Sequence, residues 1–230
     1  MSKTILVVGF GPGISTAVAE KFGHAGFAVA LVARNEERLA AGVAALQAKG
    51  IIAAAFPADA ANPHSMAAAM AKARAQLGPI TVIHCNAYGG VEAGDLLATN
   101  PAAVRGLFDV AVVGLLATVQ EALPDLKASQ EAAVLVTNGA FGEASPQMDQ
   151  LAVGLKTMGV ALANAAKAKL VGLLAQALKC EDIYVGEVMV AGAVKGTQWA
   201  SGADGIDAAT IAGRFWDLYQ ARDEIRARVS

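Results

Sequence analysis

Cysteine is scarce in this sequence, and its scarcity argues against two kinds of scaffold. Only Cys85 and Cys180 occur among the 230 residues, far apart and outside any Cys-x-x-Cys pair. We therefore expect neither a disulfide framework nor a zinc site, and we expect no bound metal. A chain with so few cysteines fits a reducing compartment, which predicts a cytoplasmic location.

Neither sign of charge predominates. The chain carries 18 basic and 20 acidic residues, which gives a net charge of −2. We therefore expect no long-range attraction to nucleic acid or to an anionic membrane surface. The uncharged run VAVVGLLATV (110–119) is well short of the ~20 residues of a membrane helix, so we predict no membrane span. A small molecule remains as the expected binding partner.

Aromatic residues are also few, although the chain is rich in apolar ones. They make up 5% of the sequence, against 55% for all hydrophobic residues, so the core must consist mainly of alanine, valine and leucine. This composition suits helices packed closely on a sheet. The length favours a single domain over residues 1–230.

Aliphatic runs alternate with helical patterns along the whole chain. The runs lack polar alternation, which predicts buried parallel strands at 4–9, 28–33, 51–56, 80–85, 132–137 and 183–190. Helices are expected at 13–25, 35–49, 63–77, 101–123 and 148–180, and a last helix precedes a short edge strand at 224–229. The alternation predicts a doubly wound parallel sheet with helices on both faces, a Rossmann-type three-layer α/β/α fold. The glycine-rich stretch 192–207 is expected to form a mobile lid over a ligand.

Three glycines stand close together after the first expected strand. Gly9, Gly11 and Gly13 occur in GFGPGIS, where that strand gives way to a helix. Glycines let the backbone approach a phosphate, and the amino end of a helix offers free N–H groups and a positive dipole end. We predict that the turn binds the pyrophosphate of a dinucleotide, with Ile14 and Ser15 among the contacts. A tight turn needed only for packing is the alternative.

The second expected strand ends in LVARNEER (31–38). A dinucleotide fold presents the adenosine ribose about 20 residues after the glycine turn, where an acidic residue would bind the 2′-hydroxyl. Here Ala33 is neutral and Arg34 is basic, which favours a 2′-phosphate. We therefore predict NADP rather than NAD. In the alternative, Arg34 is a solvated surface residue near Glu36 and Arg38.

Further motifs follow the glycine turn in a telling order: PADA (57–60), CNAYG (85–89), AAKAKLVGLLAQAL (165–178) and VAGAVKGT (190–197). Together with the turn, they resemble the motifs of the short-chain dehydrogenase/reductase family over essentially the whole chain. The resemblance implies small-molecule oxidoreductase chemistry and a homodimer or homotetramer formed through the outer faces of the two long helices. It also implies these cofactor contacts: Asp59, Asn86, Ala87, Lys167, Val194 and Thr197.

The active-site motif departs from the family pattern. Family members use an Asn-Ser-Tyr-Lys tetrad, of which only Lys167 is clearly present. The other three positions match Ala111, Gly139 (or its neighbour Asn138) and Ala163, and no tyrosine lies anywhere between residues 88 and 184. The chain therefore lacks the usual phenol that transfers a proton as hydride moves.

Tyr88 is the substitute proton donor that we predict, because it follows a central strand at the edge where ligands of such sheets bind. A tyrosine that only packs its ring is the alternative. We predict an NADP(H)-dependent oxidoreductase acting on a small carbonyl or alcohol, with Lys167 and Tyr88 as its catalytic residues. The alternatives are an NADP-binding sensor or partner-binding module without turnover, and a reductase of C=C or C=N bonds. His84 is expected to be a core residue.

Overall fold

Seven parallel strands join one sheet in the computed structural model, which describes residues 3–89, 91–197, 200 and 204–230. Along the chain these are β1 (Thr4–Val8), β2 (Ala28–Ala33), β3 (Ala53–Pro57), β4 (Ile80–Cys85), β5 (Ala133–Gly139), β6 (Tyr184–Val190) and β7 (Arg226–Val229). Their order in the sheet is β3-β2-β1-β4-β5-β6-β7, and every neighbouring pair is parallel. The predicted doubly wound sheet is confirmed.

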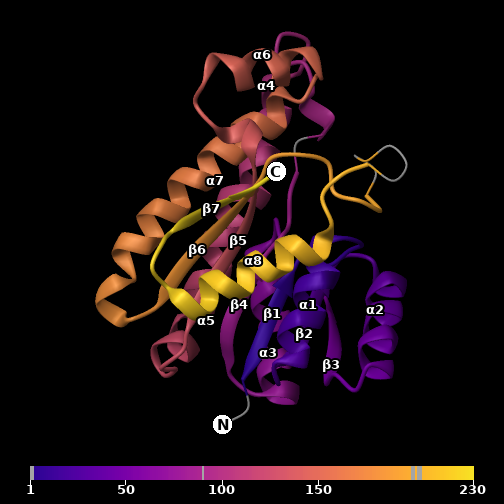
Figure 1. The fold of residues 1–230 in the computed structure, drawn as a ribbon, viewed down its shortest axis with the longest axis vertical. Coiled ribbons are helices and arrows are strands. Elements are labelled where there is room, and N and C mark those ends of the chain that lie inside the picture. Colours follow the sequence, from indigo (N-terminus) through magenta and orange to yellow (C-terminus); the bar gives the residue numbers. More distant parts are fainter. Residues whose placement is uncertain (1–2, 90, 198–199, 201–203) are drawn as a thin grey trace.

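Helices cover both faces of this sheet (Figure 1). One face carries α1 (Ile14–His24), α2 (Glu36–Ala48) and α8 (Ala208–Ala221), and the other carries α3 (Pro63–Leu77), α5 (Leu115–Lys127) and α7 (Met158–Ala177). The short helices α4 (Pro101–Phe108) and α6 (Pro146–Gly154) lie beyond the carboxyl ends of the strands, at the top of Figure 1. The remaining helical turns are η1 (Val91–Ala93), the π-helix η2 (Asp109–Gly114), η3 (Ala140–Gly142) and η4 (Lys179–Glu181).

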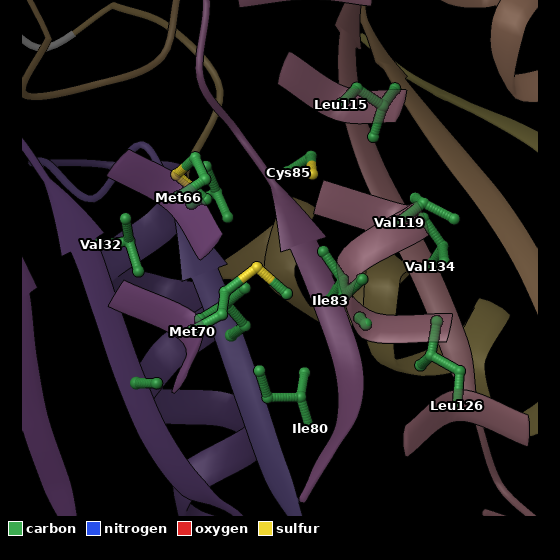
Figure 2. Close-up of a cluster of buried hydrophobic side chains, with 14 of the residues drawn as sticks. Val32, Met66, Met70, Ile80, Ile83, Cys85, Leu115, Val119, Leu126 and Val134 are labelled. Carbon is green, nitrogen blue, oxygen red and sulfur yellow. The ribbon is translucent and has the colours of Figure 1, made fainter. Parts of the chain in front are cut away.

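Each face of the sheet has its own apolar core, because successive side chains of a strand point to opposite faces. Figure 2 shows the core on the α3 and α5 side, where methionines of α3 and leucines of α5 pack on β1, β4 and β5. On β4, Ile83 and Cys85 belong to this core, whereas the ring of His84 points to the opposite face and packs against Phe215 of α8. The expected core position of His84 is confirmed.

The prediction of one continuous helix over 148–180 is wrong. The segment consists of α6 and α7, which are separated at Leu155–Thr157, where Lys156 has a φ of 51°. The break brings the carbonyl of Lys156 against Gly94, and Met158 N–H donates to Gly94 O at 3.2 Å. A contact distant in the sequence, which periodicity cannot register, therefore decides where the helix is interrupted.

Two helical segments have the length and apolar composition of a membrane span, namely Pro101–Lys127 and Met158–Ala177. The run 110–119 is only part of the first segment, because α4, η2 and α5 follow one another without a break. Its short length is therefore no argument against a membrane span. Both segments also pack on the protein core, as buried helices of globular folds do: Val119 and Leu126 of α5 and Val171 of α7 are buried in the core under the sheet.

The predicted lid lies partly outside the described residues, which omit 198–199 and 201–203. Near the two ends of the segment, Val194 forms an isolated parallel bridge with Ile206. This bridge holds the start of the segment next to its end, and Val194 is buried.

Candidate cofactor and active site

The glycine turn lies against the end of β4. Gly9 has a φ of 81°, and a Cβ there would lie 2.5 Å from Ala87 N and 2.6 Å from Ala87 Cα. Gly13 has a φ of 89°, and its Cβ would lie 3.0 Å from the methyl group of Thr197 and 3.7 Å from Val194 Cγ1. At Gly9 both the backbone angle and the available space exclude a side chain, and at Gly13 the positive φ favours glycine.

The amino end of α1 has backbone N–H groups of the kind that phosphate binding uses. Gly13 caps the helix without a side-chain acceptor, and the first helical bond runs from Ala17 N–H to Gly13 O. The N–H groups of residues 14–16 therefore have no carbonyl within the helix, as in any first turn. They form a natural seat for an anion.

The hydroxyl groups of this turn are engaged within it. Ser15 is fully buried; its Oγ accepts from Gly11 N–H and donates to Gly11 O, both at 2.9 Å. Thr16 Oγ1 donates to the same carbonyl at 2.8 Å. Ser15 thus shapes the turn in this structure, and Ile14 begins the helix beside it, partly buried.

The other predicted cofactor residues gather at the carboxyl ends of the neighbouring strands. Asn86 Nδ2 donates to Gly9 O at 3.4 Å, which ties the end of β4 to the turn. After β3, Asp59 Oδ1 accepts from Ala61 N–H at 3.0 Å. Arg34 follows β2 and is exposed. The topology therefore brings Arg34, Asp59 and Asn86 to the one edge of the sheet where the turn lies.

Lys167 reaches the same edge from α7. Its Nζ donates to Ala87 O at 3.1 Å and to Thr137 O at 3.4 Å, so it bridges the ends of β4 and β5. The side chain is only 4% exposed. Burial lowers the pKa of Lys167, an effect that the charge of Glu187 nearby partly offsets. Burial raises the pKa of the Cys85 thiol to about 12, so the thiol stays protonated.

Tyr88 follows Ala87 directly and is 52% exposed. It is thus adjacent in the chain to the carbonyl that Lys167 binds. The residue therefore lies exposed at the carboxyl edge of the sheet, where ligands of such folds bind.

Two of the positions that we predict to match the tetrad, Ala111 and Ala163, are buried in apolar packing. Ala111 in the π-helix η2 is 1% exposed and Ala163 in α7 is 3% exposed; both pack with Ala93 and Leu107 in one apolar cluster. A cavity of about 10 Å³ remains beside Lys167 and Ala111, roughly the room for one water molecule. This cavity is too small for a tyrosine ring.

The serine position is closed in a different way. A Cβ at Gly139 would lie 2.6 Å from Nδ2 of Asn164, so the amide of Asn164 occupies the space into which a serine would extend. Asn138, the alternative match, is committed to structure: its Nδ2 donates to Glu187 Oε1 at 2.6 Å and to Asn164 O at 3.0 Å.

Glu187 is a residue of this region that the sequence argument overlooked. It is fully buried on β6, and its second oxygen pairs with Arg226 of β7. A carboxylate in the middle of the aliphatic run IYVGEVMV was the available signal, since a charge buried in a strand needs a partner. The network of Asn138, Glu187 and Arg226 joins β5, β6 and β7. The charge of Glu187 also acts on Lys167, whose pKa it raises. No group of three or more possible metal ligands occurs among the described residues.

The model of the short chain dehydrogenase family matches residues 3–150, which include the glycine turn and stop before α7. No curated protein matches the sequence.

Solved structures resemble the whole chain. A short chain dehydrogenase from Burkholderia cenocepacia J2315 in complex with NADP has a TM-score of 0.86 and 22% identity, over 99% of this chain and 96% of its own. L-sorbose reductase from Gluconobacter frateurii, complexed with NADPH and L-sorbose, has a TM-score of 0.85 and 18% identity, over 100% and 95%. A metagenomic short-chain oxidoreductase in complex with NADP has a TM-score of 0.79 and 21% identity, over 99% and 96%. The chain belongs to the short-chain dehydrogenase family of NAD(P)-dependent oxidoreductases.

Proposed function

We propose that the protein is an NADP(H)-dependent oxidoreductase that transfers hydride to or from a small carbonyl or alcohol substrate and uses a non-standard proton donor. The observation that carries this proposal is Arg34, which stands at the end of β2 where an acidic residue would select NAD. The fit of the glycine turn adds support, because a Cβ would fill the cradle at Gly9 and Gly13. Several similar solved structures contain NADP or NADPH.

The residues of this chain divide the work by their positions. When bound, the nicotinamide cofactor supplies or accepts the hydride. The turn and the amino end of α1 would hold its pyrophosphate, and Asp59, Asn86, Val194 and Thr197 line the same edge of the sheet. Lys167 would hold the ribose hydroxyls near Ala87. Tyr88 would give its phenolic proton to the substrate oxygen during reduction and take it back during oxidation.

Hydride transfer tests this function directly. We expect deuterium from one face of C4-deuterated NADPH to appear in the product for at least one member of a carbonyl, imine and enone panel. We expect Tyr88→Phe to lower kcat by roughly 10²- to 10⁴-fold without changing the Kd for NADPH. Tyr184→Phe is the control, because that hydroxyl donates to Glu224 O at the amino ends of β6 and β7, at the edge of the sheet opposite the glycine turn.

Two outcomes would contradict parts of the proposal. Tight NADPH binding without transfer across the panel would favour a binding protein. Unchanged turnover in Tyr88→Phe would instead assign the proton to solvent or substrate.

Cofactor preference has its own test. Arg34→Ala should weaken NADPH binding roughly tenfold or more, because a charge-assisted bond to the 2′-phosphate is lost, and should leave NADH binding unchanged. Fluorescence titration with each nucleotide measures both constants. Equal affinities of the wild type for NADPH and NADH would refute the preference.

We also propose a homodimer or homotetramer in the cytoplasm. Apolar side chains remain exposed on the outer face of the long helices, including Val113, Leu162 and Leu173 at 44%, 39% and 56%. Pairing of these faces between copies would remove them from water. Both cysteines are free, which agrees with a reducing compartment.

A further inference from the structure

Asn164 places a buried side-chain amide at the carboxyl end of β5. It belongs to α7 and is only 7% exposed. A Cβ at Gly139 would lie 2.6 Å from Asn164 Nδ2, so the amide occupies the space where a side chain of Gly139 would begin. A Cβ at Gly142 would lie 2.6 Å from Asn164 C and 2.8 Å from Asn164 Cβ. Two residues without side chains thus admit the Asn164 amide to the end of this strand.

The main chain of Asn164 is fixed to β5. Its carbonyl accepts a hydrogen bond from Asn138 Nδ2 at 3.0 Å, and Asn138 Oδ1 accepts one from Gly139 N–H at 3.0 Å. Asn138 Nδ2 also donates to the buried Glu187 at 2.6 Å. These bonds hold this part of α7 against the last residues of β5. The position of the Asn164 amide is therefore set before any ligand binds.

The amide itself is unpaired. In the described part of the chain, neither Nδ2 nor Oδ1 of Asn164 forms a hydrogen bond. An amide has two N–H donors and one acceptor oxygen, and leaving these groups buried without partners costs free energy. Buried polar side chains are therefore nearly always paired. A ligand with an oxygen atom would supply the partner that the protein does not.

The amide lies next to the part of the site that Lys167 occupies. Asn164 and Lys167 are three residues apart on α7, which places them on the same face of the helix. Lys167 Nζ donates to Thr137 O at 3.4 Å, whereas the Asn164 amide faces Gly139, two residues further along β5. The amide is thus nearer than Lys167 to the carboxyl edge, where ligands of open α/β sheets bind.

We propose that Asn164 is a further catalytic residue, whose Nδ2 donates a hydrogen bond to the carbonyl or alcohol oxygen of the substrate. This inference rests on the proposed function and names the group that holds the reacting oxygen. The hydrogen bond strengthens as negative charge develops on that oxygen. Because the donor is buried and already fixed, it needs little reorganisation when the charge develops.

The step balances without a proton from Asn164. In the reducing direction, hydride adds to the carbonyl carbon, and the π-electron pair of the C=O bond moves to the oxygen. Loss of the hydride oxidises the bound cofactor. The oxygen takes the phenolic proton of Tyr88, and solvent returns a proton to the phenolate. The Asn164 amide only donates a hydrogen bond throughout.

Binding of a small alcohol tests this role without turnover. The probe is trifluoroethanol, whose oxygen accepts a hydrogen bond and whose fluorine atoms report binding by NMR. Its Kd is measured with the NADP⁺ complexes of the wild type, Asn164→Ala, Asn164→Asp and Gln176→Ala. Gln176→Ala is the matched control, because it removes an exposed amide from the same helix, about 18 Å away along the axis.

We expect Asn164→Ala to weaken trifluoroethanol binding roughly tenfold or more, because the alcohol oxygen loses a buried donor. Gln176→Ala should bind the probe as the wild type does, and no variant should change the Kd for NADPH. With a carbonyl substrate, kcat/KM of Asn164→Ala should fall by roughly 10²- to 10³-fold, the usual loss for one donor to a developing oxyanion.

Asn164→Asp gives a pH signature that a packing role would not produce. An ionised carboxylate cannot donate a hydrogen bond and repels a developing alkoxide, whereas a protonated carboxyl donates through its O–H. Relative to the wild type, its affinity for trifluoroethanol and its kcat/KM should therefore rise as the pH is lowered from about 8 to about 5.

Gly139 provides variants that leave Asn164 in the chain or replace its donor. In Gly139→Ala, the new Cβ displaces the amide, so trifluoroethanol should bind as weakly as it does to Asn164→Ala. Combining the two changes should add no further loss. Gly139→Ser together with Asn164→Ala should recover part of the binding, because a serine hydroxyl then has room to donate at the same place.

The outcomes separate this inference from the proposed function. If trifluoroethanol does not bind to the wild-type complex, or binds equally to Asn164→Ala, the inference is overturned. Hydride transfer with an unchanged kcat/KM in Asn164→Ala would also overturn it, while sparing the proposed function. Binding that depends on Asn164, without hydride transfer to any member of the panel, would support the oxygen site and refute turnover instead.

Discussion

Replacement of Gly9 by alanine should abolish NADPH binding and lower the free energy of unfolding by about 3 kcal/mol. The new Cβ would lie 2.5 Å from Ala87 N, 2.6 Å from Ala87 Cα and 2.9 Å from Asn86 C. All three atoms belong to backbone, so no rotamer change relieves the overlap. The φ of 81° adds strain for any L side chain. The turn must therefore move away from β4, and the seat for the pyrophosphate moves with it.

Gly11→Ala is the matched control two residues away. The nearest atom to its Cβ would be Arg38 Nη1 at 3.7 Å, an ordinary contact with the end of a flexible side chain, and its φ is not positive. The free energy of unfolding should change by less than about 1 kcal/mol. Urea denaturation and NADPH titration of both variants provide the measurement. If Gly9→Ala were as stable as Gly11→Ala, the close approach of the turn to β4 would be refuted.

The sheet and its cofactor edge were predictable because each depends on local signals. Aliphatic runs define the strands, and a glycine cluster after the first run marks the turn. Asn62 and Asn100 cap α3 and α4 as their Asn-Pro sequences indicate. Since the carboxyl ends of parallel strands share one edge of the sheet, residues that directly follow different strands must lie at that edge. The positions of Arg34 and Asn86 at this edge could therefore be predicted without knowledge of contacts distant in the sequence.

The state of the reaction centre was not predictable in this way. The sequence predicts that Ala111 and Ala163 stand where the family has functional residues, but it does not predict that both pack with Ala93 and Leu107 in one apolar cluster. That packing depends on η1 and α4, which are far from α7 in the sequence. The break between α6 and α7 has the same origin, because it arises from the contact with Gly94.

The contact of Arg38 with the turn illustrates the same limit on the cofactor side. As one arginine of a charged RNEER stretch, it has the pattern of a solvated helix face. Only the packing of α2 beside the turn brings its guanidinium to Gly11. Sequence patterns thus located the backbone of the site, and tertiary packing selected the side chains that reach it.

Protein stability should fall in mild acid because of His84. The ring is fully buried; its Nε2 lies 3.0 Å from Thr137 Oγ1, and its Nδ1 has no hydrogen-bond partner among the described residues. Burial lowers the pKa of His84 from 6.5 to about 3. Between these pH values the unfolded chain binds a proton that the folded chain refuses, so the free energy of unfolding falls as the pH falls. The slope is about 1.4 kcal/mol per pH unit, or about 2.5 kcal/mol between pH 6.5 and 4.5.

The measurement is urea denaturation of the wild type, His84→Gln and His24→Gln across pH 7.5 to 4.5. Other groups also titrate in this range, so the difference between variants isolates the histidine. His84→Gln should remove the 2.5 kcal/mol decline, whereas His24→Gln, at an exposed position in α1, should keep it. If His84→Gln is too unstable to compare, the ring protons of wild-type His84 provide a second test by NMR. They should show no titration shift above pH 4.5, because the folded protein keeps this imidazole neutral, and a midpoint near 6.5 would refute the burial argument.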